Sequence, residues 1–166
     1  MRFQNLSVLV ALGLAVGACD RRAAHEHRAE PAVNAELAPP RAAPQRVRAV
    51  GQLGPGRGTL VVSLEAPANG KLTTGAPLRL EASGEHLEFP TRIDEKLDPE
   101  KLPLRIPVDV ADGATGPAHV KLHYFWCGSG EGSACRPERA ELVVELDTSG
   151  DSAGGEAHLT HRAAGS

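Results

Sequence analysis

The sequence predicts an all-β fold, a single antiparallel immunoglobulin-like β-sandwich of about seven strands that follows a disordered tether. The first observation behind this prediction is alternation, because apolar and polar residues exchange at successive positions in Leu78–Ala82 and again in His119–Cys127. The second is spacing, since turn residues interrupt the alternating stretches about every 8–15 residues. The third is that only Asp98–Leu102 favours a helical turn.

The predicted strands lie within one domain, residues 57–163. A domain of about 105 residues buries enough surface to fold alone. Pro103 and Pro107 lie within the stretch Leu102–Val108, and this favours an edge position because proline has no N–H to donate to a neighbouring strand. In chain order, we expect strands at residues 59–65, 78–82, 87–89, 102–108, 119–127, 140–147 and 156–161.

The segment before this domain differs in composition. Residues 19–56 are rich in alanine, proline and arginine, and residues 20–50 contain no aromatic side chain. Such a stretch buries too little apolar surface to offset the entropy lost on ordering, so we predict a flexible tether. The tether serves either as a plain spacer or, through Arg21, Arg22 and Arg28, as a contact for anionic lipid head groups.

Residues 1–18 have the features of a secretory signal: Arg2, an apolar run from Leu6 to Val16, and small residues at the end. The run is shorter than the roughly 20 apolar residues that span a bilayer. It ends in Val-Gly-Ala-Cys, with the cysteine at position 19, and therefore resembles the signal peptide and lipobox of bacterial lipoproteins. The resemblance implies cleavage before Cys19 and attachment of diacylglycerol to its sulfur. It also implies a place in the bacterial cell envelope, anchored to the inner or outer membrane and facing the periplasm. The alternative is an ordinary signal peptide that contains a cysteine.

The chain has three cysteines, Cys19, Cys127 and Cys135. Lipid on Cys19 would leave the other two as a pair, in a compartment where disulfides persist. We therefore predict a Cys127–Cys135 disulfide that closes the tip of a β-hairpin. Three interpretations stay open at this point: a structural bridge, a bridge that exchanges with other thiols, and free thiols or a metal site.

Strand alternation also predicts which way the side chains before Cys127 point. One face of this strand carries apolar residues and the other is mostly polar. The first face has Val120, Leu122, Tyr124 and Trp126, and the second has His119, Lys121, His123, Phe125 and Cys127.

The same hairpin carries a family resemblance. A strand with aromatic residues before Cys127, a short polar loop, Cys135 and the alternating stretch Ala140–Leu146 resemble a β-sandwich module at the C-terminal end of thioredoxin-like and NHL-repeat proteins. The turn at residues 70–77 is similar to the Gly-x-Leu-Thr-x-Gly-x-Pro turn of that module, so the likeness covers about Leu60 to Leu146. More distantly, the domain is similar to the immunoglobulin-like N-terminal domain of DsbD-type disulfide reductases, whose two cysteines carry redox chemistry. This sequence has no Cys-x-x-Cys, and seven residues separate Cys127 from Cys135.

The histidines form no pattern that is typical of a metal centre. His119 and His123 share a strand face but are about 13 Å apart along the strand, too far to ligate one ion. His158 and His161 are expected on opposite faces of their strand. We therefore expect no metal, no cofactor and no catalytic residue, with copper or zinc binding by histidines as the alternative.

Charge excludes one class of partner. Residues 51–166 contain 11 Lys and Arg against 17 Asp and Glu, which gives 11 − 17 = −6, whereas a nucleic-acid-binding surface needs a basic patch. The sequence thus predicts a membrane-anchored envelope lipoprotein that presents a non-catalytic binding or accessory domain. Its partners would be the membrane, through lipid on Cys19, and an envelope protein. The alternative function is thiol–disulfide exchange by Cys127 and Cys135.

Overall fold

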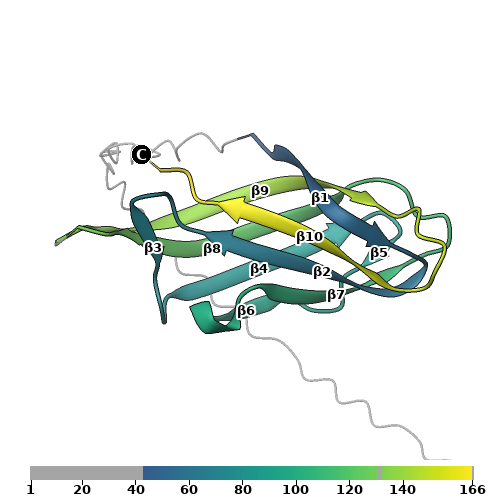
Figure 1. Ribbon diagram of the computed structural model, residues 1–166, viewed down its shortest axis with the longest axis horizontal. Helices are drawn as coiled ribbons and strands as arrows, with labels where there is room; N and C mark the ends of the chain where they lie inside the picture. The colour runs from purple at the N-terminus through teal and green to yellow at the C-terminus, as the bar shows by residue number, and fades with distance from the viewer. Residues whose placement is uncertain (1–42, 131, 166) are drawn as a thin grey trace, which may run out of the picture. The chain divides into compact units, whose positions relative to one another are not determined.

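The structure, a computed structural model, describes residues 43–130 and 132–165 of the chain. The predicted all-β class is confirmed, because this part contains ten strands and a single short 3-10 helix (Figure 1). The strands are β1 (Gln45–Leu53), β2 (Gly56–Glu65), β3 (Gly70–Leu72), β4 (Pro77–Gly84), β5 (Leu87–Glu88), β6 (Ile93–Lys96), β7 (Leu104–Val110), β8 (Ala118–Gly128), β9 (Cys135–Asp147) and β10 (Gly155–Arg162), and the helix η1 spans Pro99–Lys101.

The predicted antiparallel immunoglobulin-like sandwich is wrong, because the sheet closes into a mixed barrel of eight strands. Around the barrel the order is β8-β9-β1-β10-β2-β7-β5-β4, and β4 closes the ring by pairing Arg79–Gly84 with Ala118–His123 of β8. In two pairs of adjacent strands, β1 with β9 and β10 with β2, the strands run parallel. The short strands β3 and β6 add to β8 and β4 outside the ring.

Strand β1 explains much of this difference. The sequence assigned residues up to 56 to the tether, but Gln45–Leu53 form a strand that joins β9 to β10. The folded domain therefore begins about one strand earlier than the predicted boundary at residue 57. Only Ala49 and Leu53 of β1 are buried, and its exposed residues include Arg46 and Arg48. The strand therefore has too few apolar residues on its inner face for a clear alternating pattern.

β1 contains an irregularity in its pairing with β9. The two strands pair from Gln45 to Arg48 and again at Gln52, with a shift of register in between, while Val50–Leu53 pair with β10 on the other side. Gly51 lies at this shift with a φ of 110°, and a Cβ there would come within 2.3 Å of the carbonyl oxygen of Glu156. Only glycine tolerates both conditions. Since Gln45 is paired with Leu142, the described part of β1 does not extend along the first seven residues of β9.

The barrel interior holds one apolar core. The predicted inner face of β8 is confirmed, because Val120, Leu122, Tyr124 and Trp126 are all buried. Burying a large apolar side chain contributes about 1.5–3 kcal/mol, so the core accounts for much of the stability of the fold. The largest side chains with under 2 % exposure are Tyr124, Leu53, Leu60, Leu78, Leu80, Leu97, Ile106, Leu142, Leu159, Val61, Val62 and Val108.

Two smaller expectations concern the region around η1. The helical turn predicted at Asp98–Leu102 is confirmed, and the Asp98 side chain caps it by accepting a hydrogen bond from the N–H of Glu100. The stretch predicted as an edge strand, Leu102–Val108, corresponds to β7, which pairs with β2 along its length but with β5 only at Asp109 and Val110.

Within residues 43–130 and 132–165, no helix has the length and apolar character needed to cross a bilayer.

Candidate binding site at the hairpin end of the barrel

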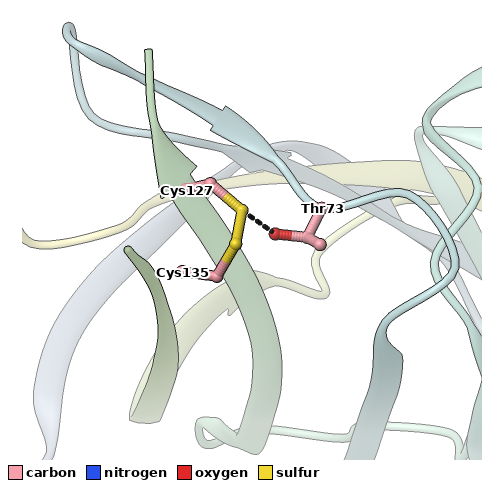
Figure 2. The surroundings of a disulfide bond; sticks show 3 residues. All are labelled: Thr73, Cys127 and Cys135. Carbon is pink, nitrogen blue, oxygen red and sulfur yellow. Dashed lines mark hydrogen bonds between the residues drawn. A yellow bond between two sulfur atoms is a disulfide. The ribbon is translucent and has the colours of Figure 1, made fainter. Parts of the chain in front are cut away.

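The predicted disulfide is present in the structure. β8 and β9 form a regular antiparallel hairpin in which Cys127 and Cys135 are directly opposite, with their Cα atoms 3.9 Å apart (Figure 2). The bond closes a loop that contains Gly128, Gly130 and Gly132, residues that permit a tight turn. The bridge therefore holds together the tip of the hairpin that projects from one end of the barrel (Figure 1).

The two halves of the bridge have different surroundings. Cys127 is buried, with 8 % of its surface exposed, whereas Cys135 is exposed. The hydroxyl of Thr73 lies 2.9 Å from Sγ of Cys127, and it must be the donor because a disulfide sulfur carries no proton (Figure 2). Thr73 follows β3 and is held in place because its N–H donates to the carbonyl of Phe125 over 3.0 Å. The bridge is thus covered on the Cys127 side and open on the Cys135 side.

The opposite face of the same hairpin forms one wall of a cleft. The cleft has a volume of about 550 Å³ and lies at the mouth of the barrel, beside Trp126. The guanidinium carbon of Arg136 lies 5.8 Å from the centre of the Trp126 ring, in the range of a cation–π contact. The remaining lining residues come from the turn after β2, from the hairpin loop and from the chain after β10: Pro67, Ala68, Asn69, Gly128, Ser133, Ala134 and Gly165.

Hydrogen bonds fix the walls of this cleft relative to each other. Both the N–H and the hydroxyl of Ser129 donate to the carbonyl of Asn69, over 2.9 and 3.1 Å, and so join the hairpin loop to the turn after β2. The turn itself is closed by the N–H of Gly70, which donates to the carbonyl of Pro67. A Cβ at Gly70 would lie 3.0 Å from the Trp126 ring, so a side chain at this position would have to displace the indole or the turn by a few tenths of an ångström. The cleft is therefore formed in advance of any ligand.

Polar side chains lie below the cleft, inside the barrel. On β10, His161 is 5 % exposed, and its Nε2 lies 3.5 Å from Oε1 of Glu138 on β9. The His161 ring meets the Tyr124 ring edge to face at 5.9 Å, and the Tyr124 hydroxyl donates to the carbonyl of Glu65. These groups make the hairpin end the polar end of an otherwise apolar interior.

Burial controls the protonation of these groups. Desolvation lowers the pKa of His161 below its usual value, although the carboxylate of Glu138 opposes part of that effect. Desolvation, with help from the charges of Glu138 and Glu65, raises the pKa of Tyr124 well above its usual value. His161 is therefore neutral at pH 7, and the tyrosine hydroxyl keeps its proton. Neither the ring Nε2 of His161 nor the indole Nε1 of Trp126 has a hydrogen-bond partner among the described residues.

Several predicted site residues lie apart from this cleft. Cys19, the expected lipidation site, lies outside the described residues, as do His25 and His27 of the predicted tether, two of the histidines considered for copper or zinc binding. His119 and His123 are on the outer face of β8, where burial and the nearby charges of Arg139 and Arg79 lower the pKa of His123. The prediction that the two C-terminal histidines point to opposite faces is confirmed, because His158 is exposed and His161 is buried.

The structure also bears on metal binding. In residues 43–130 and 132–165, no three His, Cys, Asp or Glu side chains come close enough together to hold an ion.

Sequence patterns alone do not reveal some of the site residues. Thr73 lies in a predicted turn, and its contact with Cys127 depends on β3 pairing with β8. His161 and Glu138 meet across the barrel interior, so no sequence spacing links them. Arg136 is the exception, because its register opposite Trp126 follows from hairpin pairing once the disulfide is assumed.

Comparisons with known proteins add no assignment. No protein-family model matches the chain, and no curated protein matches its sequence.

Proposed function

We propose that this protein is a lipid-anchored protein of the bacterial cell envelope whose β-barrel is a binding or accessory domain. The observation that carries the proposal is the cleft at the hairpin end, which Trp126 and Arg136 line. Its walls are held together by the disulfide, by the two hydrogen bonds from Ser129 to Asn69 and by the close approach of Gly70 to the indole. Preformed clefts at the mouths of β-barrels are common binding sites. A binding site needs such preorganisation, because rigid walls reduce the entropy lost when a ligand docks.

The anchor is supported by the sequence before the barrel. The lipobox-like tetrapeptide ends at Cys19, and β1 begins at Gln45, 26 positions later. At the polyproline rise of about 3.1 Å per residue, this segment would reach about 80 Å, enough to present the barrel away from the membrane surface. Anchoring would raise the concentration of the domain near a membrane-bound partner.

Metabolic labelling tests the anchor. Cells that express the full chain are fed a palmitate analogue, with a Cys19→Ala variant as the matched control. We expect label on the wild-type protein in the membrane fraction and none on the variant. Equal labelling of both proteins, or no labelling of either, would contradict lipidation at Cys19.

Site-specific photo-crosslinking tests the binding role. A photoreactive amino acid replaces Ala134, in the cleft wall, and in a control chain it replaces the exposed Asp112. We expect a defined crosslinked product from position 134 that is absent from position 112. The same products from both positions, or none from 134, would count against a binding site at the cleft.

The alternative function is thiol–disulfide exchange, and the unequal surroundings of the two cysteines favour it specifically. An external thiolate would attack Sγ of exposed Cys135, forming a mixed disulfide there, and the Cys127–Cys135 bond would break with its electron pair on Sγ of Cys127. The Thr73 hydroxyl, 2.9 Å away, would then donate to the new Cys127 thiolate. Such a bond stabilises the leaving group, which speeds exchange.

Trapping experiments distinguish this alternative from a structural bridge. In a Cys19→Ala background, the Cys127→Ser variant retains Cys135 and should accumulate mixed disulfides with an envelope thiol, whereas Cys135→Ser should not. Thr73→Val should slow reduction of the intact bridge by dithiothreitol, and Thr73→Ser should restore the rate. Absence of mixed disulfides from Cys127→Ser would argue against exchange.

A further inference from the structure

We propose that the outward face of strands β4, β8 and β9, around Phe125, docks an acidic segment of a partner protein. This inference goes beyond the proposed function, because the surface lies on the other face of the hairpin from the cleft.

A row of cationic and titratable residues crosses this face. Arg79 of β4 lies opposite His123 of β8, and His123 lies opposite Arg139 of β9. Directly opposite residues of antiparallel strands project to the same side of the sheet, so the three side chains are neighbours. Arg79 forms an ion pair with Asp94 at 3.2 Å, whereas Arg139 is exposed and has no acidic partner among the described residues. Arg139 is therefore available to an external carboxylate.

Two lysines enlarge the positive area. Lys71 on β3 lies opposite Cys127 of β8, and Lys96 on β6 lies opposite Pro77 of β4. Both lysines are exposed. We call the area around Phe125 the cationic patch, and its members are Lys71, Arg79, Lys96, His123 and Arg139.

The cationic patch is a local feature of an acidic domain. Residues 51–166 contain 17 Asp and Glu against 11 Lys and Arg. Two residues farther from the hairpin tip, Lys121 of β8 lies in register between Glu81 and Glu141, so opposite charges alternate there. The cations near the hairpin tip are thus gathered by the position of individual residues and not by composition. Such a patch is complementary in charge to an acidic partner.

An aromatic side chain lies in the middle of the cationic patch. Phe125 is partly exposed and lies outside the core to which its neighbours Tyr124 and Trp126 belong. Its ring contacts that of His123, with centroids 5.2 Å apart, and Phe125 lies opposite the exposed Pro137. Protein interfaces are enriched in aromatic residues and arginine, so this combination favours docking of a protein.

His123 adds a polar atom that has no partner. Its Nε2 is buried and has no hydrogen-bond partner among the described residues. Burial, and then the charges of Arg139 and Arg79, lower the pKa of His123, so the ring is neutral at pH 7. A carboxylate bound between the two arginines would offset their charges and raise this pKa. The titration of His123 therefore reports on occupation of the patch.

The spacing of the cations favours a chain with several acids over a single small anion. Neighbouring strands are about 4.8 Å apart, which places the Cα atoms of Arg79 and Arg139 about 10 Å from each other. Acidic residues two or three apart on an extended chain are separated by about 7–10 Å and can reach both arginines. A membrane surface fits less well, because Phe125 is only partly exposed and membrane-surface proteins insert apolar side chains about 5–10 Å deep.

Titration followed by nuclear magnetic resonance tests the proposal on the full chain carrying Cys19→Ala, so that no lipid interferes. The probe is acetyl-Glu-Glu-Leu-Glu-Glu-amide, in which acids surround one apolar residue, and the matched control peptide has glutamine at the four acidic positions. We expect saturable shifts in the amide signals of His123, Phe125 and Arg139 with the acidic peptide, and binding about 10-fold weaker or less for the glutamine peptide. The affinity should fall as salt increases, and the pKa of His123 should rise in the complex.

Charge reversal locates the site. Arg139→Glu should weaken binding of the acidic peptide about 10-fold or more, and Arg139→Gln about 5-fold. The matched controls, Arg57→Glu and Arg57→Gln, change the same charge on β2, on the opposite side of the barrel, and should alter the affinity less than about 2-fold. Both arginines are exposed, and near-ultraviolet circular dichroism checks that each variant keeps the native fold.

Three results would overturn the inference. Equal affinity for the two peptides, or for wild type and Arg139→Glu, would exclude recognition of acids by the cationic patch. Sedimentation with phosphatidylglycerol vesicles, without binding of the acidic peptide, would assign the patch to a membrane surface. No saturable shift in a protein with native circular dichroism would reject the docking role. None of these results bears on the cleft, which the crosslinks from position 134 test separately.

Discussion

The disulfide gives the clearest quantitative prediction of this structure. Reducing the Cys127–Cys135 bond, in a Cys19→Ala background that leaves only these two cysteines, removes a closed ring of nine residues from the unfolded chain. Loop-closure entropy for a ring of that size corresponds to about 2.5 kcal/mol of stability. The hairpin does not depend on the bond alone, since ten residue pairs join β8 and β9, and we expect these pairs to persist on reduction. The effect should therefore come mainly from the unfolded state.

Urea unfolding, followed by Trp126 fluorescence, measures this difference. With a slope of about 1–3 kcal/mol/M, the midpoint of the reduced protein should fall by about 0.8–2.5 M relative to the oxidised protein. The Cys127→Ser/Cys135→Ser double variant should behave like the reduced wild type, because the serine introduced at position 127 keeps a hydrogen-bonding group beside the Thr73 hydroxyl. A loss of less than about 0.5 kcal/mol would refute the reasoning, because it would mean that the bridge does not restrict the unfolded chain.

The remaining predictions concern pH, packing and the cleft wall. Because burial lowers the pKa of His161, the unfolded state binds a proton more readily, so stability is complete above about pH 6.5 and decreases as the pH falls below it; in thermal melts between pH 5 and 8, His161→Gln should reduce this slope to the part that the lowered pKa of His123 contributes, while Tyr124→Phe keeps it. Leu60→Ala, at a fully buried position, should cost about 2–5 kcal/mol in urea unfolding, and the exposed Val50→Ala less than about 0.5 kcal/mol. Gly70→Ala should cost about 1–3 kcal/mol and shift the Trp126 emission, because its Cβ would press on the indole ring at 3.0 Å; unchanged emission would contradict the close contact.

The strands that the sequence predicts best are those with strong alternation. β4, β8 and β10 appear close to their expected bounds, and the inner face of β8 is as predicted. These strands have one apolar face toward a single core, so period two is visible in the residues themselves. The disulfide followed from the cysteine count, since lipid on Cys19 would leave Cys127 and Cys135 as a pair.

The barrel was less predictable, because its closure depends on partners far apart in sequence. β1 has a basic outer face and only Ala49 and Leu53 buried, so its composition is typical of a tether rather than a strand. The parallel pairings of β1 with β9 and of β10 with β2 join strands that are far apart in sequence. No residue pattern within one of these strands indicates its partner. The contact of His161 with Glu138 depends on the same closure and could not be read from spacing.

The reduction potential of the Cys127–Cys135 bond tests the central claim most directly, because it separates a binding domain with a structural bridge from an exchange protein. The measurement equilibrates the full chain carrying Cys19→Ala with dithiothreitol or glutathione buffers and follows the thiols by alkylation. A binding domain predicts a potential below about −300 mV, which resists the glutathione pool. A value of about −120 to −230 mV, in the range of proteins that exchange disulfides, would contradict the binding proposal and favour thiol–disulfide exchange.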